Sequence, residues 1–319
     1  MDNTWFVGKR VGVVGCGRWG SKHLKTLQNI SAEASIDFIG ACDVDSDALE
    51  RAGSMGFSIH DNPKTFVSTF QLDSVIVVTP NETHFALGKQ YLLDGVNVFL
   101  EKPLATSFDH ASTLVSLAIQ EGMSLKSGFL LRFHPCIRDA KQQIRTGQIG
   151  AIQAIHYRKK SKRTADSTSH ALDSLAIHGV DLAEFLLDGQ TPLRISETIG
   201  SRTSTNLILE YPNQVEIHID VGWDSATDIA ELEIIGTNGR IHVSLQDHEN
   251  YTIEQNVRVL HTVDCSHTPL EGILLDFLNS ASPSVASSTG SILRTIKCIE
   301  QARLELTIPG RLNTRELKG

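Results

Sequence analysis

The sequence predicts an α/β protein of two domains. A doubly wound parallel sheet is expected over residues 1–127, and an α+β domain with a large, mainly antiparallel open sheet over residues 128–319. Two observations predict this division. In the first third of the chain, short apolar runs alternate with helical patterns, which is typical of a parallel sheet. After about residue 150, the strand-like runs alternate apolar with polar residues, which is typical of antiparallel strands with one wet face.

The composition is that of a globular protein with a sizeable core, because 40% of the residues are hydrophobic and 21% are charged. The formal net charge of −8 disfavours nucleic acid as a partner. Five cysteines are scattered without a C-x-x-C pair, and no apolar run is long enough to span a membrane. We therefore expect a cytoplasmic protein with reduced thiols, without a bound metal and without a nucleic-acid or membrane partner.

The first predicted strand ends in a glycine pattern. Residues 11–20 read VGVVGCGRWG, an apolar run that breaks into Gly15, Gly17 and Gly20 before a helical pattern. Glycines at this spacing allow a tight turn and let backbone N–H groups approach a pyrophosphate at a helix N-terminus. An acid about 20 residues further on completes the motif, and Asp43 ends the next apolar run. These features predict a dinucleotide-binding Rossmann domain.

The remaining elements follow in order along the first domain. Its strands are predicted at 10–14, 38–42, 74–80, 96–100 and 123–127. Its helices are predicted at 21–29, 46–53, 83–93 and 107–120. This spacing of strand and helix is that of a doubly wound sheet.

The second domain is expected to contain one large sheet, whose strands are interrupted in the sequence by a helix. Its strands are predicted at 152–157, 194–199, 206–211, 214–221, 230–235 and 240–245. Its helices are predicted at 172–187, 272–281 and 290–303. The segments 211–214 and 236–239 read as hairpin turns.

Several motifs together resemble one enzyme family. The tripeptide Glu101-Lys102-Pro103 follows a predicted strand, and segments typical of the same family occur along nearly the whole chain. These segments read TPNETH from 79, GFLLRFHP from 128, GQIG from 147, HGVD from 178 and ELEIIGTNG from 231. The combination resembles the glucose–fructose oxidoreductase, inositol dehydrogenase and MocA (Gfo/Idh/MocA) family. This resemblance implies NAD(P)-dependent oxidation or reduction of a sugar or cyclitol carbon, and a homodimer or homotetramer formed through the open sheet face.

The resemblance also indicates the catalytic residues. Lys102 would stand at the carboxyl edge of the parallel sheet, where a cation can stabilise a developing alkoxide. His178 would be the general base, because imidazole can accept a hydroxyl proton near neutral pH. The alternative interpretations are a surface lysine and a structural histidine on an apolar helix face.

One position departs from the family pattern. Many members carry an aspartate four residues before the histidine, where this chain has Ser174. Asp173 lies five residues before His178, which on an α-helix rotates it by about 140° from that side chain. Either the helix start is shifted or unwound, or the enzyme works without this acid. We expect Ser174 and Asp181 to contact substrate, although Asp181 could equally be a solvated or structural acid.

The cofactor site is expected to favour NAD over NADP. Asp43 would accept hydrogen bonds from the adenosine ribose hydroxyls, and its charge would repel a 2′-phosphate. Arg18 is a candidate phosphate contact, and Trp19 is expected mainly to pack. Family resemblance adds the other predicted cofactor contacts, which are Thr79, Pro80, Asn81, His84, Glu101 and Lys102.

A basic run stands out in this acidic chain. Residues 158–163 read RKKSKR, with five cations in six positions. Such a run is usually a solvated face. The alternative is a site for a phosphorylated sugar, with Arg158, Lys160 and Arg163 as the phosphate ligands. Arg132 is a further candidate substrate contact.

The favoured function is an NAD-dependent oxidoreductase that acts on a nucleotide-diphosphate sugar, a sugar phosphate or an amino-sugar intermediate. The first alternative is a dehydrogenase of a free sugar or cyclitol, which the absence of the family aspartate disfavours. The second alternative is a non-catalytic NAD-binding sensor, because a fold does not guarantee a function.

Overall fold

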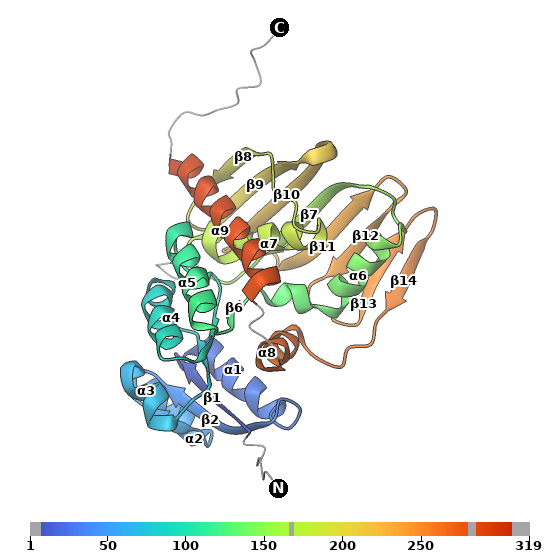
Figure 1. Cartoon of the computed structure of the whole chain (residues 1–319). Coiled ribbons are helices and arrows are strands. Elements are labelled where there is room, and N and C mark those ends of the chain that lie inside the picture. Colours follow the sequence, from blue (N-terminus) through green and yellow to red (C-terminus); the bar gives the residue numbers. More distant parts are fainter. Residues whose placement is uncertain (1–7, 166–168, 280–284, 308–319) are drawn as a thin grey trace. The chain divides into compact units, whose positions relative to one another are not determined.

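The computed structural model describes residues 8–165, 169–279 and 285–307 (Figure 1). The chain forms two compact units. The first comprises Met1–Phe133 and His267–Leu293, and the second comprises His134–Ser266 and Arg294–Gly319.

The first unit contains a six-stranded parallel sheet in the order β3-β2-β1-β4-β5-β6. Its strands are β1 (Lys9–Val14), β2 (Ile36–Cys42), β3 (Ser58–His60), β4 (Ser74–Val77), β5 (Asn97–Leu100) and β6 (Leu125–Ser127). Its helices include α1 (Arg18–Asn29), α2 (Ser46–Ser54), α3 (Pro63–Phe70), α4 (His84–Leu93), α5 (Phe108–Glu121) and α8 (Pro269–Asn279), with short 3₁₀ turns η1 (Asn81–Thr83) and η2 (Leu130–Phe133). The strand order reverses between β1 and β4, which in doubly wound sheets is where ligands bind.

The core of the first unit joins the sheet to α1 and α8. Val13, Leu24 and Phe99 are completely buried in the same cluster as Ile273 and Phe277 of α8. Helix α8 therefore completes the core of the unit that contains the parallel sheet.

The second unit contains an eight-stranded sheet in the order β14-β13-β12-β11-β7-β10-β9-β8. Its strands are β7 (Ile152–Lys160), β8 (Arg194–Gly200), β9 (Ser204–Tyr211), β10 (Val215–Gly222), β11 (Ile229–Gly236), β12 (Gly239–Ser244), β13 (Asn250–Glu254) and β14 (Arg258–Thr262). Its helical segments include α6 (Pro135–Arg145), the π-helix η3 (Leu172–Ala176), α7 (Ile177–Leu186) and the 3₁₀ turn η4 (Pro212–Gln214), and α9 (Val285–Thr307) begins in the first unit and continues in the second. Only β7 and β10 pair in parallel, and the other neighbours in this sheet are antiparallel.

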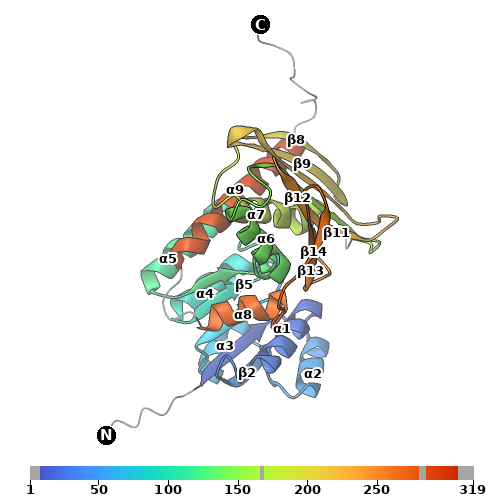
Figure 2. The ribbon, with the colours of Figure 1, turned by 90° about the vertical axis from the view of Figure 1, so that its right-hand side faces the viewer.

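The two faces of this sheet have different surroundings. Helices α6 and α7 lie on one face (Figure 2). The odd-numbered residues Ile155 and Tyr157 of β7 point toward this covered face and are buried. The even-numbered residue Arg158 points the opposite way and is exposed.

The predicted fold class is confirmed, and so are the turns that join β9 to β10 and β11 to β12. The predicted boundary at residue 127 differs from the observed grouping, because α8 packs into the core of the first unit. The prediction omitted α3, α6, β3, β13 and β14. Residues 280 and 281, where a helix was predicted to end, lie outside the described residues.

None of the helices in the described part of the chain is long and apolar enough to cross a membrane. Within the same residues, no group of three or more His, Cys, Asp and Glu side chains is arranged to hold a metal ion.

Candidate active site

The glycine loop joins β1 to α1 with very little space. Gly15 has φ of +93°, and a Cβ atom there would lie 2.5 Å from the carbonyl oxygen of Val78. A Cβ atom on Gly20 would lie 1.7 Å from the carbonyl oxygen of Gly15. Glycine is therefore required at both positions for the loop to follow this path.

Gly17 lies on the open side of the same loop. A Cβ atom there would meet no described atom within 4 Å, and the residue is exposed. Gly17 is also the N-cap of α1 and has no side chain with which to satisfy the first N–H groups of the helix. The free N–H groups and the open space form a cradle that fits a pyrophosphate.

Asp43 lies directly after β2 and is fixed by this loop. Its Oδ2 accepts the Cys16 N–H at 2.6 Å, and its Oδ1 accepts the Asp45 N–H at 3.0 Å. Each carboxylate oxygen has a second lone pair that can accept a ribose hydroxyl. The buried Cys16 thiol stays protonated, because burial and then the charge of Asp43 raise its pKa to about 12.

Arg18 and Trp19 begin α1 on its exposed side. The Trp19 side chain is 41% exposed, and the Lys22 ammonium lies 4.6 Å from the centre of its ring. The described packing partner of the Trp19 ring is therefore the Lys22 side chain on the surface of α1. Both residues stay predicted cofactor contacts.

The turn after β4 is linked to the Glu101-Lys102-Pro103 turn by a buried histidine. His84 Nδ1 lies 2.8 Å from the carbonyl oxygen of Pro103, and its Nε2 lies 3.0 Å from that of Thr79. Thr79 also forms a 2.6 Å hydrogen bond with the hydroxyl of Thr83. His84 is completely buried, so its observed contacts position the two turns. Pro80 and Asn81 lie between Thr79 and His84, at the start of η1.

Glu101 supports Lys102 after β5. Its Oε1 lies 2.8 Å from Nε2 of the buried His23, and its Oε2 accepts the Lys102 N–H at 3.0 Å. Burial raises the pKa of the Glu101 carboxyl, but the hydrogen bond from His23 and the charges of His23 and Lys102 lower it below its usual value. Glu101 therefore remains a carboxylate beside the predicted catalytic lysine.

Arg132 lies in η2 at the end of the first unit. Its guanidinium donates to the Ser291 hydroxyl of α9. The arginine is half-buried, and its proposed contact with substrate stays a prediction.

His178 is the one accessible side chain in its stretch of α7. From Ala176 to Glu184, all of which the structure describes, every other residue is buried and His178 is half-buried. Gly179 brings the helix close to the sheet, because a Cβ atom there would lie 2.7 Å from Cδ1 of Tyr157. The buried part of α7 thus fixes the position of His178 relative to the sheet.

The start of the helix that carries His178 is irregular, which is the first of the two alternatives given above for the position of Ser174. The segment Leu172–Ala176 is a π-helix, in which residues five apart lie about one turn apart. Asp173 is therefore closer to the face of His178 than a regular α-helix would allow. Its carboxylate is 2.5 Å from the Arg303 guanidinium of α9, and Ser174 is half-buried.

Asp181 is 1% exposed, so the interpretation of this residue as a solvated acid is wrong. Its location on the buried side of α7 is compatible with a positioning role for His178, which lies three residues earlier.

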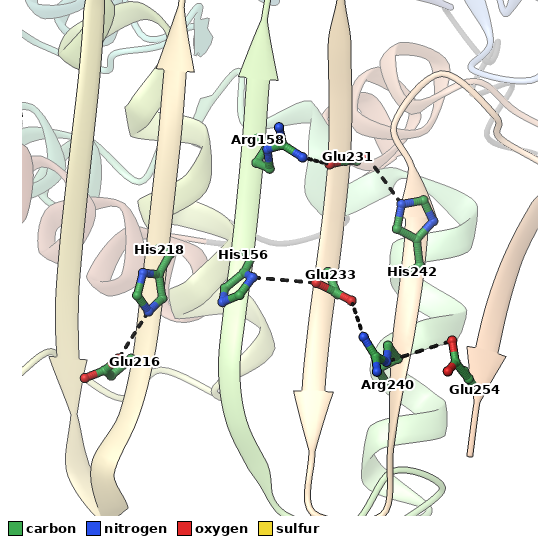
Figure 3. Close-up of polar contacts among 9 residues, drawn as sticks. All are labelled: His156, Arg158, Glu216, His218, Glu231, Glu233, Arg240, His242 and Glu254. Atoms are coloured by element: carbon green, nitrogen blue, oxygen red, sulfur yellow. Dashed lines mark hydrogen bonds and ion pairs between the residues drawn. The ribbon is translucent and has the colours of Figure 1, made fainter. Parts of the chain in front are cut away.

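The basic run does not act as a unit, because β7 turns its side chains alternately to the two faces. Figure 3 shows Arg158 directed at Glu231 on the face without α7, and the two are 2.6 Å apart. Lys160 forms an ion pair with Asp220 on the same face. Arg158 and Lys160 thus lie on the face opposite to α7 and are each paired with a carboxylate, which disfavours the prediction that they bind a phosphorylated sugar. Arg163 is exposed in the following loop, and its role stays a prediction.

Sequence reasoning missed two residues near the predicted catalytic groups. His23 holds Glu101, and its spacing from Gly20, Leu24 and Leu27 on the buried side of α1 was the available signal. Lys159 faces the covered side of the second sheet, and its odd position after Tyr157 was the available signal.

Two family models match the chain. The model described as "Oxidoreductase family, NAD-binding Rossmann fold" matches residues 9–129, and the "GFO/IDH/MocA C-terminal domain" matches residues 137–242. Together they span both sheets.

Curated relatives support the same assignment. Inositol 2-dehydrogenase 2 of Saccharopolyspora erythraea is 27% identical over 222 residues, which is 66% of this chain and 66% of that enzyme. The scyllo-inositol 2-dehydrogenase (NAD(+)) of Bacillus subtilis is 27% identical over 267 residues, which is 76% of each chain.

A solved structure shows the same fold over almost the whole chain. The UDP-N-acetylglucosamine 3-dehydrogenase from Acidithiobacillus ferrooxidans is similar with a TM-score of 0.81 and 20% identity, over 93% of this chain and 97% of that one. With both family models matched in order, the chain belongs to the Gfo/Idh/MocA oxidoreductase family, with that family's NAD-binding Rossmann domain and C-terminal domain.

Proposed function

We propose that the protein is an NAD-dependent dehydrogenase of a sugar hydroxyl, with His178 as general base and Lys102 as the cation that stabilises the reacting oxygen. The observation that carries this proposal is the exposure pattern of α7, in which His178 alone is accessible between Ala176 and Glu184, all described residues. A buried helix that presents one imidazole is suited to positioned proton transfer.

The cofactor residues support NAD in particular. Gly17 leaves room for the pyrophosphate, and Asp43 has lone pairs available for the ribose hydroxyls. The Asp43 carboxylate would repel the 2′-phosphate of NADP. When bound, the nicotinamide supplies a two-electron acceptor or donor for a hydride.

The protein's own groups account for the proton and the oxygen. In the oxidative direction, His178 accepts the hydroxyl proton as the carbon–oxygen bond becomes a carbonyl, and it returns that proton in the reductive direction. The Lys102 ammonium stabilises the partial negative charge on the oxygen. Glu101 and His23 keep the backbone before Lys102 in place.

The substrate class has two candidates. A nucleotide-diphosphate sugar, sugar phosphate or amino sugar remains our first proposal, now without Arg158 and Lys160 as its ligands. A free sugar or neutral cyclitol is the second candidate, because the curated relatives reported above are inositol dehydrogenases. Ser174, where many family members carry an aspartate, favours the first candidate.

We also propose that a second copy of the chain covers the open face of the eight-stranded sheet. This face carries alternating acidic and basic residues, including His156 3.6 Å from Glu233 and Arg240 3.4 Å from the same carboxylate (Figure 3). The edge strand β14 adds Leu260 to this face, which pairs in register with Thr252 of β13 and is 65% exposed. Sedimentation of wild-type protein and of Glu233→Arg tests this proposal. A wild-type monomer would contradict it, and an assembly weakened by the substitution would support it.

The test of the enzymatic proposal is hydride transfer with NAD across a panel of nucleotide-diphosphate sugars, sugar phosphates, free sugars and cyclitols. We expect turnover with a phosphorylated sugar that is lost in His178→Ala. Turnover only with free sugars or cyclitols would select the second candidate. Tight NAD binding without turnover on the panel would contradict the enzymatic proposal and favour a sensor.

A further inference from the structure

Strand β7 presents two neighbouring lysines to opposite faces of the sheet. Lys159 pairs in register with Val221 of β10 and with Ala230 of β11, and both partners are buried. Because side chains alternate along a strand, Lys159 points to the same face as Tyr157, which contacts α7 at Gly179. Lys160 points to the other face.

The segment from Ala171 to Gly179, which contains His178, contacts the sheet at both of its ends. These two contacts show which strand residues the segment covers. At one end of this segment, Gly179 approaches Tyr157 of β7 and Ile219 of β10. These two residues are register partners, so this end of the segment lies at the level of Tyr157.

The other end of the segment lies further along the strands. The Ala171 N–H donates to the Arg202 carbonyl at 2.8 Å, in the turn that precedes Ser204. Ser204 pairs with Gly222 of β10, and Gly222 pairs with Lys160 of β7.

The segment from Ala171 to Gly179 therefore runs from the level of Lys160 back to that of Tyr157. Lys159 lies between these two levels, on the face that this segment covers. The half-buried polar residues of the segment are Asp173, Ser174 and His178, and the Asp173 carboxylate is already paired with the Arg303 guanidinium.

The surroundings of Lys159 favour an anionic ligand. Its side chain is half-buried, and burial lowers the pKa of its ammonium, whereas the charge of Asp228 raises it. The Asp228 carboxylate is exposed and accepts the Lys162 N–H at 2.9 Å. A partly desolvated cation gains more from an anion than a solvated one does. Lys160, by contrast, forms its ion pair with Asp220.

We propose that Lys159 is a substrate-binding residue that recognises an anionic substituent of the sugar, either a phosphate or a carboxylate. This inference rests on the proposed function for its sugar and adds the chemical class of that sugar. Lysine binds such groups as a compact point charge.

The experiment measures equilibrium binding of matched sugar pairs, in the presence of excess NADH. The pairs are glucose with glucose 6-phosphate, glucose with glucuronate, and N-acetylglucosamine with UDP-N-acetylglucosamine. The variants are Lys159→Met, Lys159→Arg and, as the matched control from the same strand, Lys160→Met.

We expect wild-type protein to prefer the anionic member of at least one pair. Lys159→Met should weaken binding of that member by about tenfold to a hundredfold, without weakening binding of its neutral partner. Lys159→Arg should retain most of the preference, and Lys160→Met should retain all of it. Preference for glucose 6-phosphate or the UDP sugar identifies a phosphate, and preference for glucuronate identifies a carboxylate.

The inference is overturned if wild type shows no preference in any pair, or if Lys159→Met keeps the wild-type preference. Failure of the proposed function is a different result. A protein that binds an anionic sugar through Lys159 but transfers no hydride with any sugar contradicts the enzymatic proposal alone. A protein that oxidises neutral sugars without a charge preference contradicts the role of Lys159 alone.

Discussion

The loop between β1 and α1 and the end of strand β7 form their predicted binding sites in different ways. In the first, backbone geometry decides: Gly20 permits the loop to close on Gly15, and Gly17 leaves the helix N-terminus open. In the second, side-chain direction decides, since Lys159 and Lys160 differ by one residue and face opposite sides of the sheet. A site formed by backbone atoms depends on which positions are glycine. A site formed by side chains depends on which face of the sheet each strand residue points to.

The largest expected effect is at the backbone site. Gly20→Ala would place a Cβ atom 1.7 Å from the Gly15 carbonyl oxygen, so the loop must move. We expect NAD affinity to fall by about a thousandfold, or about 4 kcal/mol, in a titration of binding. Gly17→Ala is the control for fold: it should melt like wild type while it still loses NAD affinity, because its methyl group would occupy the cradle. Wild-type NAD binding by Gly20→Ala would contradict this description of the loop.

A smaller effect is expected from a buried histidine of the second unit. Burial and then the neighbouring His248 lower the pKa of His134 to about 4, although the Leu245 backbone and Asp247 act in the opposite direction. The unfolded chain therefore binds a proton near pH 6.5 that the folded chain does not bind. The free energy of unfolding should fall by up to about 3 kcal/mol as the pH drops from 6.5 to 4.

This contribution is measured as the difference between wild type and His134→Phe in denaturant titrations at several pH values. The difference should be constant above pH 6.5 and should change below it. Parallel pH curves for the two proteins would contradict the shifted pKa.

Gly179 tests how closely α7 must approach the sheet. Gly179→Ala would bring a Cβ atom to 2.7 Å from Tyr157 Cδ1, and such overpacking costs about 1–3 kcal/mol. Displacement of the neighbouring His178 should also lower kcat more than it changes KM. Gly53→Ala in α2 is the control, because its Cβ atom would lie 3.5 Å from Ile59, an ordinary contact. Equal unfolding free energies for Gly179→Ala and wild type would refute the close approach.

The smallest expected effect concerns cofactor choice. Asp43→Ser removes the charge that opposes a 2′-phosphate, so the preference for NAD over NADP should fall by about tenfold, or about 1.4 kcal/mol. The ratio of the two dissociation constants is the measurement. Asp45→Asn is the control, since Asp45 caps α2 through the Asp47 N–H and asparagine caps equally well. A ratio that shifts as much in the control as in Asp43→Ser would show that general charge is responsible.

The sequence predicted the parallel sheet and its glycine loop because these depend on local rules. It failed where the signal was weak or distant. The edge strand β14 shows no buried alternation, so it has no clear periodicity. Helix α6 was omitted although its buried residues Cys136, Ile137 and Ala140 have helical spacing. The apolar face of α8 is visible in the sequence, but its completely buried partners, such as Val13, Leu24 and Phe99, lie more than 170 residues before Ile273.

The candidate site divides in the same way. Asp43 and Lys102 follow apolar runs that end at one edge of the sheet, so the sequence places them there. Lys159 was overlooked because the run of cations concealed the alternation of β7. The π-helix before His178 adds a residue that no periodicity reveals, and this explains why the relation of Ser174 and Asp173 to His178 stayed open.

The most direct test measures NAD affinity and hydride transfer together in His178→Asn and Lys102→Met. If the backbone loop provides most of the cofactor affinity and these side chains perform the chemistry, His178→Asn should bind NAD like wild type. Lys102→Met removes one predicted cofactor contact and should lose only a small part of the NAD affinity. The kcat of both variants should fall by about a hundredfold or more. Unchanged kcat in His178→Asn would contradict its role as general base, and an unchanged value in both variants would contradict the account as a whole.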